Sequence, residues 1–353
     1  MTIKELIDIF QKTMDSAAKK EEKRPINVYD AVILAGDKRA SKKVGGMGNK
    51  TLLTIKGRPI LSYVLSALAG SKYIRDIWIV GPKEKIEEAI KPDLAKIKDR
   101  KIVVLEQWDN LIENTWNGFL HTIDGYKEGV DPDSYLNTPL EEMAALGLSG
   151  DIPLLTSYEV DEFLENAQPD KYDYIAGITP DYSLRPYYPK EKKLGIKHSY
   201  FHARDIKWRQ NNLHLGKMFK IRNKVFIEKM YEFRHQKEWK NIIKIAINIL
   251  RAEKGAYKAI YLLAVLQSCM FLTNRGFGWF SDRLRRLITL SDVENNVAAI
   301  LGTRAVTAMT HYGGAALDID NDEEFEAIKA NFDEWMAYQQ ELYNLKKGGS
   351  AKV

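Results

Sequence analysis

Residues 30–59 place a short apolar run, a long loop of glycine and lysine, and a second apolar run next to one another. The first run, residues 31–34, is stopped by Gly36, which favours a buried strand of a parallel sheet over a helix. The second run, residues 60–69, has apolar residues at helical spacing. A strand, a glycine-rich loop and a helix in this order are typical of nucleotide-binding α/β proteins.

The loop between the two runs has the composition of a phosphate-binding segment. Its glycines allow backbone N–H groups to approach a ligand closely, and its cationic side chains attract phosphates. These residues are Gly36, Gly45, Gly46 and Gly48, with Lys38, Arg39, Lys42, Lys43 and Lys50. The loop has neither the GxxxxGK[ST] nor the GxGxxG pattern. A basic surface loop without a ligand is the alternative interpretation.

Further apolar runs alternate with helical patterns along the chain. We expect strands at residues 77–80, 101–105, 174–178, 303–309 and 315–319, and one that begins near residue 144 and ends at Asp151. Helical patterns follow from residues 83, 113, 157 and 322. This alternation predicts an α/β fold with a mostly parallel sheet flanked by helices, in which ligands gather at the carboxyl ends of the strands.

The periodicity also predicts the domain organisation. Residues 1–28 form a helix and a charged linker that could dock on a second subunit; residues 29–222 and 301–345 form the core; residues 346–353 form a flexible tail. Between the two parts of the core, residues 223–300 are predicted to be an all-helical insertion. Basic residues flank this insertion, so it could contact a membrane surface or a lipid-like acceptor. Helices that simply pack on one another are the favoured interpretation.

Composition excludes several classes of protein. The net charge of +5 is small for 353 residues and does not indicate a nucleic-acid surface. A single cysteine, Cys269, excludes an intramolecular disulfide and a multi-cysteine metal site. The first residues lack the pattern of a secretion signal, and the apolar run at residues 259–272 is too short to span a membrane. We therefore expect a cytoplasmic protein.

The early motif resembles the signature of the MobA-like NTP transferases, which have a GT-A-like, Rossmann-related fold. The matching pieces are Leu34-Ala35-Gly36, Arg39, Gly48-Asn49, Lys50, Leu52-Leu53 and Gly57-Arg58-Pro59. Two departures are Asp37, where the family usually has another glycine, and a loop that is several residues longer. The resemblance implies that Leu34, Ala35, Gly36, Gly48 and Lys50 contact an NTP, and that Lys50 and Arg39 are catalytic. It also implies that Asn114 and Thr115 lie near the base and sugar; as an alternative, these two residues cap a helix.

The resemblance extends to two acidic segments that would hold a magnesium ion. Asp151 begins the sequence DIPLLT, which looks like the metal-aspartate motif of the family; a helix N-cap is the alternative role. The segment from Gly313 to Phe325 is similar to the closing segment of the family, where Asp318 is the expected second ligand and Asp320 the alternative. Mg²⁺ prefers oxygen ligands and keeps several waters, so one or two carboxylates and phosphate oxygens are enough.

The span that follows residue 180 is rich in aromatic and basic residues, and we expect the pocket for a phosphorylated acceptor there. Its candidate residues are Arg204, Lys207, Arg209, Asn211 and Asn212. A solvated, charged lid over the site is the competing interpretation.

Together these features predict a Mg²⁺-dependent nucleotidyltransferase that transfers NMP from an NTP to a phosphorylated small molecule and releases pyrophosphate. A phosphate nucleophile is already ionised at neutral pH, so no separate general base is needed. One alternative is a glycosyltransferase of the same fold that uses Asp318 and Asp320 as a metal motif. Another is a nucleotide-binding module without catalysis. The sequence does not select the base of the NTP or the acceptor.

Overall fold

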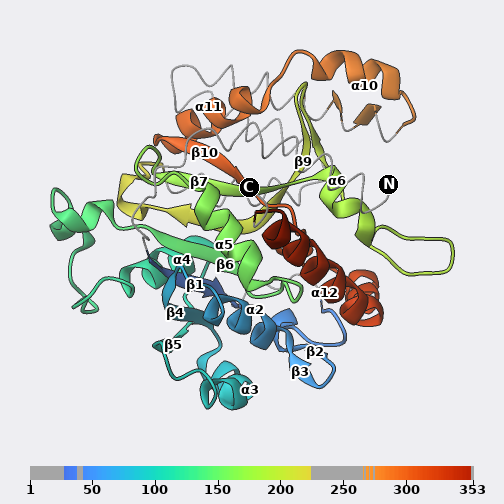
Figure 1. Ribbon diagram of the computed structural model, residues 1–353. Helices are drawn as coiled ribbons and strands as arrows, with labels where there is room; N and C mark the ends of the chain where they lie inside the picture. The colour runs from blue at the N-terminus through green and yellow to red at the C-terminus, as the bar shows by residue number, and fades with distance from the viewer. Residues whose placement is uncertain are drawn as a thin grey trace.

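The computed structural model describes residues 28–37, 43–223, 265, 268, 269, 271, 272 and 275–350. Its main sheet has eight strands in the order β10-β7-β9-β6-β1-β4-β5, with β8 paired to β9 (Figure 1). The strands are β1 (Tyr29–Leu34), β4 (Ile74–Gly81), β5 (Ile102–Glu106), β6 (Ala145–Ser149), β7 (Tyr174–Pro180), β8 (Phe201–His202), β9 (Lys207–Gly216) and β10 (Ala305–Met309). The predicted α/β fold with a mostly parallel sheet is confirmed.

Strand β9 is the exception to the parallel arrangement. It runs antiparallel to both of its neighbours, β6 and β7, and its first residues pair with the short β8 on the edge that faces β6. All other pairings in the sheet, β1 with β4 and β6, β4 with β5, and β10 with β7, are parallel. The carboxyl ends of β1, β6 and β7 therefore point to one edge of the sheet.

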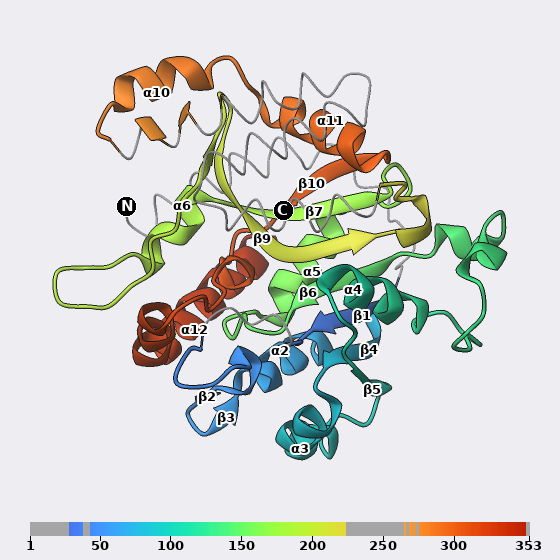
Figure 2. The ribbon, with the colours of Figure 1, turned by 180° about the vertical axis from the view of Figure 1, so that it is seen from behind.

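Helices cover both faces of the sheet (Figures 1 and 2). On one face lie α2 (Ile60–Ala69), α3 (Lys83–Leu94) and α5 (Ser157–Asn166), which share a hydrophobic core with the inward side chains of β1, β4 and β6. On the other face lie α4 (Leu111–Leu120) and α11 (Leu290–Leu301). Gly118 allows α4 to approach the sheet closely, because a Cβ there would lie 2.7 Å from a methyl carbon of Val32.

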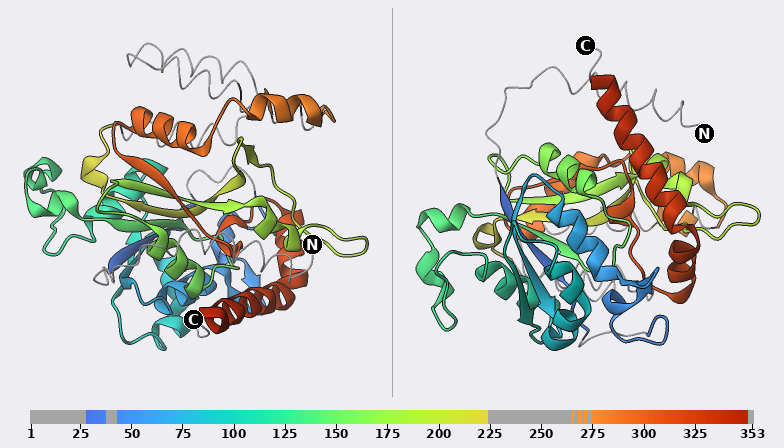
Figure 3. Two further views of the ribbon diagram at one scale, coloured as in Figure 1. Left: turned by 45° about the horizontal axis from the view of Figure 1, so that its top comes forward. Right: turned by 60° about the horizontal axis from the view of Figure 1, so that its bottom comes forward.

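A second core lies beside the sheet edge at the carboxyl ends of β1, β6 and β7. α6 (Asp181–Leu184) and the 43–59 region, with its hairpin β2 (Thr54–Ile55) and β3 (Arg58–Pro59), pack with α12 (Asp322–Ser350) around this core (Figure 3). The hairpin turns at Lys56 and Gly57, both at positive φ, which explains the glycine of the Gly-Arg-Pro motif.

Three sequence predictions differ from the structure. Residues 315–319 do not form a strand: Gly314–Ala316 is a 3₁₀ turn and the chain then runs irregularly to α12. Lys207–Gly216 was expected to be part of a polar pocket segment but forms β9. α12 continues to Ser350, although residues 346–353 were expected to be a flexible tail.

The predicted helical insertion lies mostly outside the described residues, as does the N-terminal helix. Of the insertion, α10 (Gly278–Arg285) and α11 are described, and α11 packs on β10. Within the described part of the chain, no helix is both long and apolar enough to cross a membrane.

Candidate active site

The end of the glycine-rich loop is fixed to the carboxyl end of β1 by Asn49. The buried Asn49 side chain donates a hydrogen bond to the Ala35 carbonyl at 3.0 Å. Its oxygen accepts hydrogen bonds from the backbone N–H and the hydroxyl of Thr51, at 3.0 and 2.7 Å. On the other side of the strand end, the Gly150 N–H donates to the Leu34 carbonyl at 3.0 Å. These contacts hold Lys50 and Asp151 on either side of the end of β1.

Lys50 joins three segments that are far apart in the sequence. Its ammonium donates hydrogen bonds to Asp151 Oδ2 at 3.3 Å, to Asp320 Oδ1 at 3.1 Å and to the Ile319 carbonyl at 2.6 Å. The Ile319 N–H also donates to the Asp151 carbonyl at 3.2 Å, so the two acidic segments run side by side. The structure thus brings Lys50, Asp151 and the 318–320 segment together at the predicted edge.

Burial and charge shift the pKa values of this cluster. Burial alone lowers the pKa of Lys50, but Asp151 and Asp320 outweigh it and raise the pKa to about 12. The pKa of Asp151 is raised chiefly by burial, against the opposing effect of Lys50, and the nearby Asp318 and Asp320 carboxylates raise it further. Ser149 donates a hydrogen bond to Asp151 and favours its charged form. A second cation at this point would relieve the repulsion among the three carboxylates.

Asp318 and Asp320 have different surroundings. Asp318 is buried and accepts a hydrogen bond at 2.8 Å from Arg209, whose Nε also donates to the Ala316 carbonyl at 3.0 Å. The Asp320 side chain is more exposed, and its backbone N–H donates to Glu324. Both carboxylates lie close enough to Asp151 to raise its pKa.

Helix capping was the alternative role for Asp151 and Asn114, but other side chains cap these helices. Thr156 caps α5 in place of Asp151, and Asn110 caps α4 in place of Asn114. At the start of α12, the Asn321 side chain accepts from the Glu324 N–H. Asp151 and Asn114 are therefore not used as helix caps.

A second group of polar side chains surrounds Gly36, beside the end of β1. A Cβ at Gly36 would lie 2.9 Å from Gln107 Oε1 and 3.2 Å from Asn114 Nδ2. Gln107 exchanges two hydrogen bonds with Asp37, at 2.7 and 2.8 Å, and Asn114 Oδ1 accepts from the Trp108 N–H at 2.6 Å. Thr115 is turned differently, because its hydroxyl donates within α4 to the Leu111 carbonyl. Sequence reasoning missed Gln107, which follows directly after β5.

The expected acceptor residues lie in three different places. Arg209 reaches the site through Asp318, and Lys207 lies 3.6 Å from Asp181 and over the ring of Tyr200. Asn211 and Asn212 are instead buried: Asn211 binds Thr179 and Thr310, and Asn212 binds the Ala315 carbonyl. Arg204 lies exposed near the tip of the β8–β9 hairpin, where its N–H donates to the Ile288 carbonyl.

The turn before Asp318 is held by the buried side chain of Glu159, a role that the sequence analysis did not predict. Glu159 on α5 accepts hydrogen bonds from Thr310, Gly313 and Ala315, at 3.1, 3.2 and 2.9 Å. It is fully buried, and this burial raises its pKa to about 8 despite the donors that favour its charged form. Glu159 therefore positions the turn that leads to Asp318.

The two remaining expected site residues, Arg39 and Gly48, make no side-chain contact that the structure describes. Arg39 lies outside the described residues, as do the neighbouring Lys38 and Lys42. Gly48 is described, and a Cβ built on it would meet nothing within 4 Å. The space beside Gly48 is open to a ligand.

The donors at this edge suit a hard divalent cation. Among the described residues, no group of three or more His, Cys, Asp or Glu side chains is placed to hold a metal ion by itself. Asp151, Asp320 and the Ile319 carbonyl nevertheless supply oxygen ligands that already surround one cation, the Lys50 ammonium. Mg²⁺ needs only one or two carboxylates when phosphate oxygens and waters complete its shell. The residues present therefore fit such an ion.

The comparison with protein families agrees with this geometry. Residues 31–191 match the family described as MobA-like NTP transferase domain. The match covers 161 of the 353 residues, and this part of the chain is similar to a MobA-like NTP transferase domain. The matched residues include β1, the glycine-rich loop, Lys50 and Asp151, so the chain is a nucleotidyltransferase. A comparison with curated proteins finds no match.

Solved structures support the fold. A hypothetical transferase from Thermus thermophilus superposes with a TM-score of 0.54 at 22% identity, covering 84% of this chain and 99% of that chain. CMP:2-keto-3-deoxy-manno-octonic acid synthetase, complexed with CTP, gives a TM-score of 0.43 at 11% identity, covering 87% and 99%. A 4-diphosphocytidyl-2C-methyl-D-erythritol synthase from Anaerococcus prevotii gives 0.40 at 13%, covering 88% and 100%. The first likeness bears on the fold alone, and the two weaker ones carry no argument.

Proposed function

We propose that this chain transfers NMP from an NTP to a phosphorylated small molecule and releases pyrophosphate in a Mg²⁺-dependent reaction. One observation carries the proposal: Lys50 Nζ lies within 3.3 Å of Asp151 and within 3.1 Å of Asp320 at one edge of the sheet. A cation from the glycine-rich loop and carboxylates from two later segments are what a triphosphate and its metal require together.

The proposed roles follow from the positions of the side chains. The backbone around Gly36 and the open space beside Gly48 would receive the triphosphate, and Lys50 would exchange its carboxylate partners for phosphate oxygens. Gln107 and Asn114, whose side chains both lie beside Gly36, would bound the nucleoside end of this space. Each contact is electrostatic or positional, which suits a reaction in which phosphate groups of like charge must approach.

Asp151, with Asp318 or Asp320, would hold Mg²⁺, which neutralises phosphate charge during the transfer. Arg209 keeps Asp318 oriented through its 2.8 Å hydrogen bond and is the acceptor candidate that contacts this carboxylate. Lys207, on the same strand, would add positive charge for an acceptor phosphate. The acceptor phosphate itself is the nucleophile, so these residues need only position it.

The test is a screen of the four NTPs against a panel of sugar and polyol phosphates, with pyrophosphate release as the readout. The proposal expects release that requires one NTP, one acceptor and Mg²⁺ together. Release without an acceptor, or sugar transfer from a nucleotide-sugar donor, would contradict it. Tight NTP binding with no turnover on any acceptor would favour a binding module instead.

A matched pair of variants links the reaction to the site. Asp320→Asn removes a carboxylate that bonds Lys50, whereas Asp333→Asn removes an exposed carboxylate on α12 that pairs with Lys56. The first variant is expected to lower turnover and the second to leave it unchanged. Equal loss in both variants would point to a general effect of charge.

A further inference from the structure

An exposed apolar surface lies around α10, outside the active site described above. Its members are Phe271, Phe277, Trp279, Phe280 and Leu287, and we call them the α10 surface. Twelve large apolar side chains are exposed in the described part of the chain, and these five fall within seventeen residues. Trp279 is 66% exposed and Leu287 57% exposed. Clustering of this kind indicates a surface that contacts another phase or molecule.

The same stretch carries a strong positive charge. Residues 265–290 contain Arg275, Arg283, Arg285 and Arg286, against one acidic residue, Asp282. Over residues 224–290 there are 13 Lys and Arg and 5 Asp and Glu, although the whole chain has a net charge of only +5. The rest of the chain is therefore net negative. Arg275, Arg283 and Arg286 are exposed, and Arg275 lies over the ring of Phe271 at 5.0 Å.

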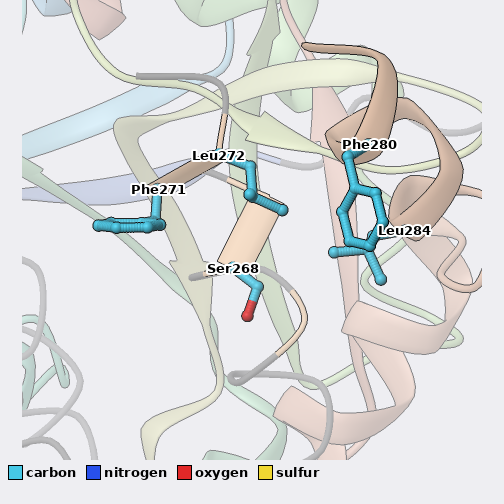
Figure 4. Close-up of a pocket in the computed structure, with 5 residues that line it drawn as sticks. All are labelled: Ser268, Phe271, Leu272, Phe280 and Leu284. Atoms are coloured by element: carbon cyan, nitrogen blue, oxygen red, sulfur yellow. The ribbon is translucent and has the colours of Figure 1, made fainter. Parts of the chain in front are cut away.

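A groove opens within this surface (Figure 4). It is lined by Phe271, Leu272, Phe280 and Leu284, with Ser268 as its only polar member among the described residues, and it encloses about 400 Å³. Figure 4 shows Phe271 on one side of Leu272 and Ser268, and Phe280 and Leu284 on the other. Aromatic rings beside a basic rim are typical of proteins that bind at a membrane–water interface.

The α10 surface is connected to the acceptor side of the active site. The Arg204 N–H at the tip of the β8–β9 hairpin donates to the carbonyl of Ile288, next to Leu287, and Asp205 accepts from the Leu290 N–H. From this tip, β9 runs back to Arg209, which bonds Asp318. At about 3.3 Å per residue, the tip is about 15 Å along the strand from Arg209.

We propose that the α10 surface docks the protein on an anionic lipid surface. The exposed aromatic and leucine side chains enter the interfacial region, and the arginines contact the lipid phosphates. A protein partner or a second copy would also cover an apolar face. The excess of arginine over acidic residues within the same stretch matches the charge of an anionic bilayer and repels a second copy of itself. Docking here would turn the β8–β9 hairpin, and with it the acceptor side of the site, toward the membrane.

The test is co-sedimentation of the full chain with vesicles of phosphatidylcholine alone or with 30 mol% phosphatidylglycerol. Binding is expected only with phosphatidylglycerol, and it should weaken steeply with salt. Each arginine near an anionic surface strengthens binding by about fivefold. Arg283→Glu/Arg286→Glu should therefore bind at least 20-fold more weakly, and Trp279→Ser/Phe280→Ser about 10-fold more weakly.

Matched controls separate these effects from folding. Leu194→Ser alters an equally exposed apolar residue, and Lys98→Glu reverses an exposed charge elsewhere; both should bind as the unmodified chain does. All variants should keep their circular dichroism spectrum and their activity in solution, so failure of docking is distinct from failure of the proposed reaction.

Two results would overturn the proposal. The first is that the unmodified chain does not bind the anionic vesicles, or that the α10 variants bind as tightly as it does. The second is a dimer in light scattering that Trp279→Ser/Phe280→Ser dissociates, with no vesicle binding. That result would assign the surface to self-association.

Discussion

Replacement of Lys50 by methionine should destabilise the fold and nearly abolish activity. The change removes the ammonium but keeps an apolar stem of similar length. It leaves Asp151 buried without the cation that offsets its burial, and Asp320 without its hydrogen-bond donor. Removing one partner from a largely buried ion pair costs more than the pair itself contributes, because the other charge stays unpaired.

The size of the effect follows from the pKa of Lys50. Its rise from 10.5 to about 12 corresponds to about 2 kcal/mol in favour of the charged amine in the folded state. A lysine whose pKa is raised by folding makes its full contribution to stability below pH 10.5, and this contribution is lost as the pH rises toward 12. At pH 7 the full contribution is present, so Lys50→Met should lower the free energy of unfolding by at least about 2 kcal/mol.

Urea denaturation followed by circular dichroism measures this loss. Lys98→Met, at an exposed lysine away from the site, is the control and should change stability by less than about 0.5 kcal/mol. The double variant Lys50→Met/Asp320→Asn should be more stable than the sum of the single changes predicts, by about 1 kcal/mol. Strict additivity, or no loss of stability in Lys50→Met, would contradict the ion-pair cluster described here.

The remaining predictions concern the reaction and the loops that support it. Asp151→Asn should lower kcat/KM by about 30- to 1000-fold, or ~2–4 kcal/mol, in the pyrophosphate assay; near-normal turnover would remove Asp151 from the metal site. EDTA should abolish turnover and added Mg²⁺ restore it, whereas chelator-resistant turnover would exclude the metal role. Gly36→Ala should weaken NTP binding by at least about 10-fold, because the new Cβ would lie 2.9 Å from Gln107 Oε1. Gly278→Ala is the matched control, since a Cβ there meets nothing within 4 Å. Equal NTP binding by both variants would contradict this role of Gly36. Between pH 5 and 8 the protein should lose stability, because Glu159 ionises in the unfolded chain while its pKa of about 8 keeps it protonated in the fold. The loss is at most about 5 kcal/mol, and Glu159→Gln should flatten this pH dependence in thermal unfolding. An unchanged pH profile in Glu159→Gln would contradict the assignment.

The elements that the sequence predicted correctly are those in which apolar residues follow the spacing of a strand or a helix. Residues 31–34 lie inside β1, and residues 60–69 coincide with α2. The same reasoning placed Lys50 and Asp151 at one sheet edge, because both follow parallel strands or their loops.

The sequence failed where buried polar side chains satisfy one another. β9 was taken for a polar pocket segment because Arg209, Asn211 and Asn212 interrupt its apolar pattern. Asn211 is nevertheless wholly buried, since Thr179 and Thr310 supply its partners across the sheet. Apart from Asp318, residues 315–319 are apolar and buried, yet they form no strand: the Ala315 N–H donates to the Glu159 side chain, and Gly314–Ala316 is a 3₁₀ turn. Tertiary partners of this kind leave no local pattern.

The structure of the chain bound to Mg²⁺ and a non-hydrolysable NTP tests the central claim most directly. The account predicts that the triphosphate lies between the glycine-rich loop and Asp151, that Lys50 contacts its oxygens, and that the metal binds Asp151 together with Asp318 or Asp320. A triphosphate bound elsewhere, with the Lys50 contacts to Asp151 and Asp320 unchanged, would contradict it.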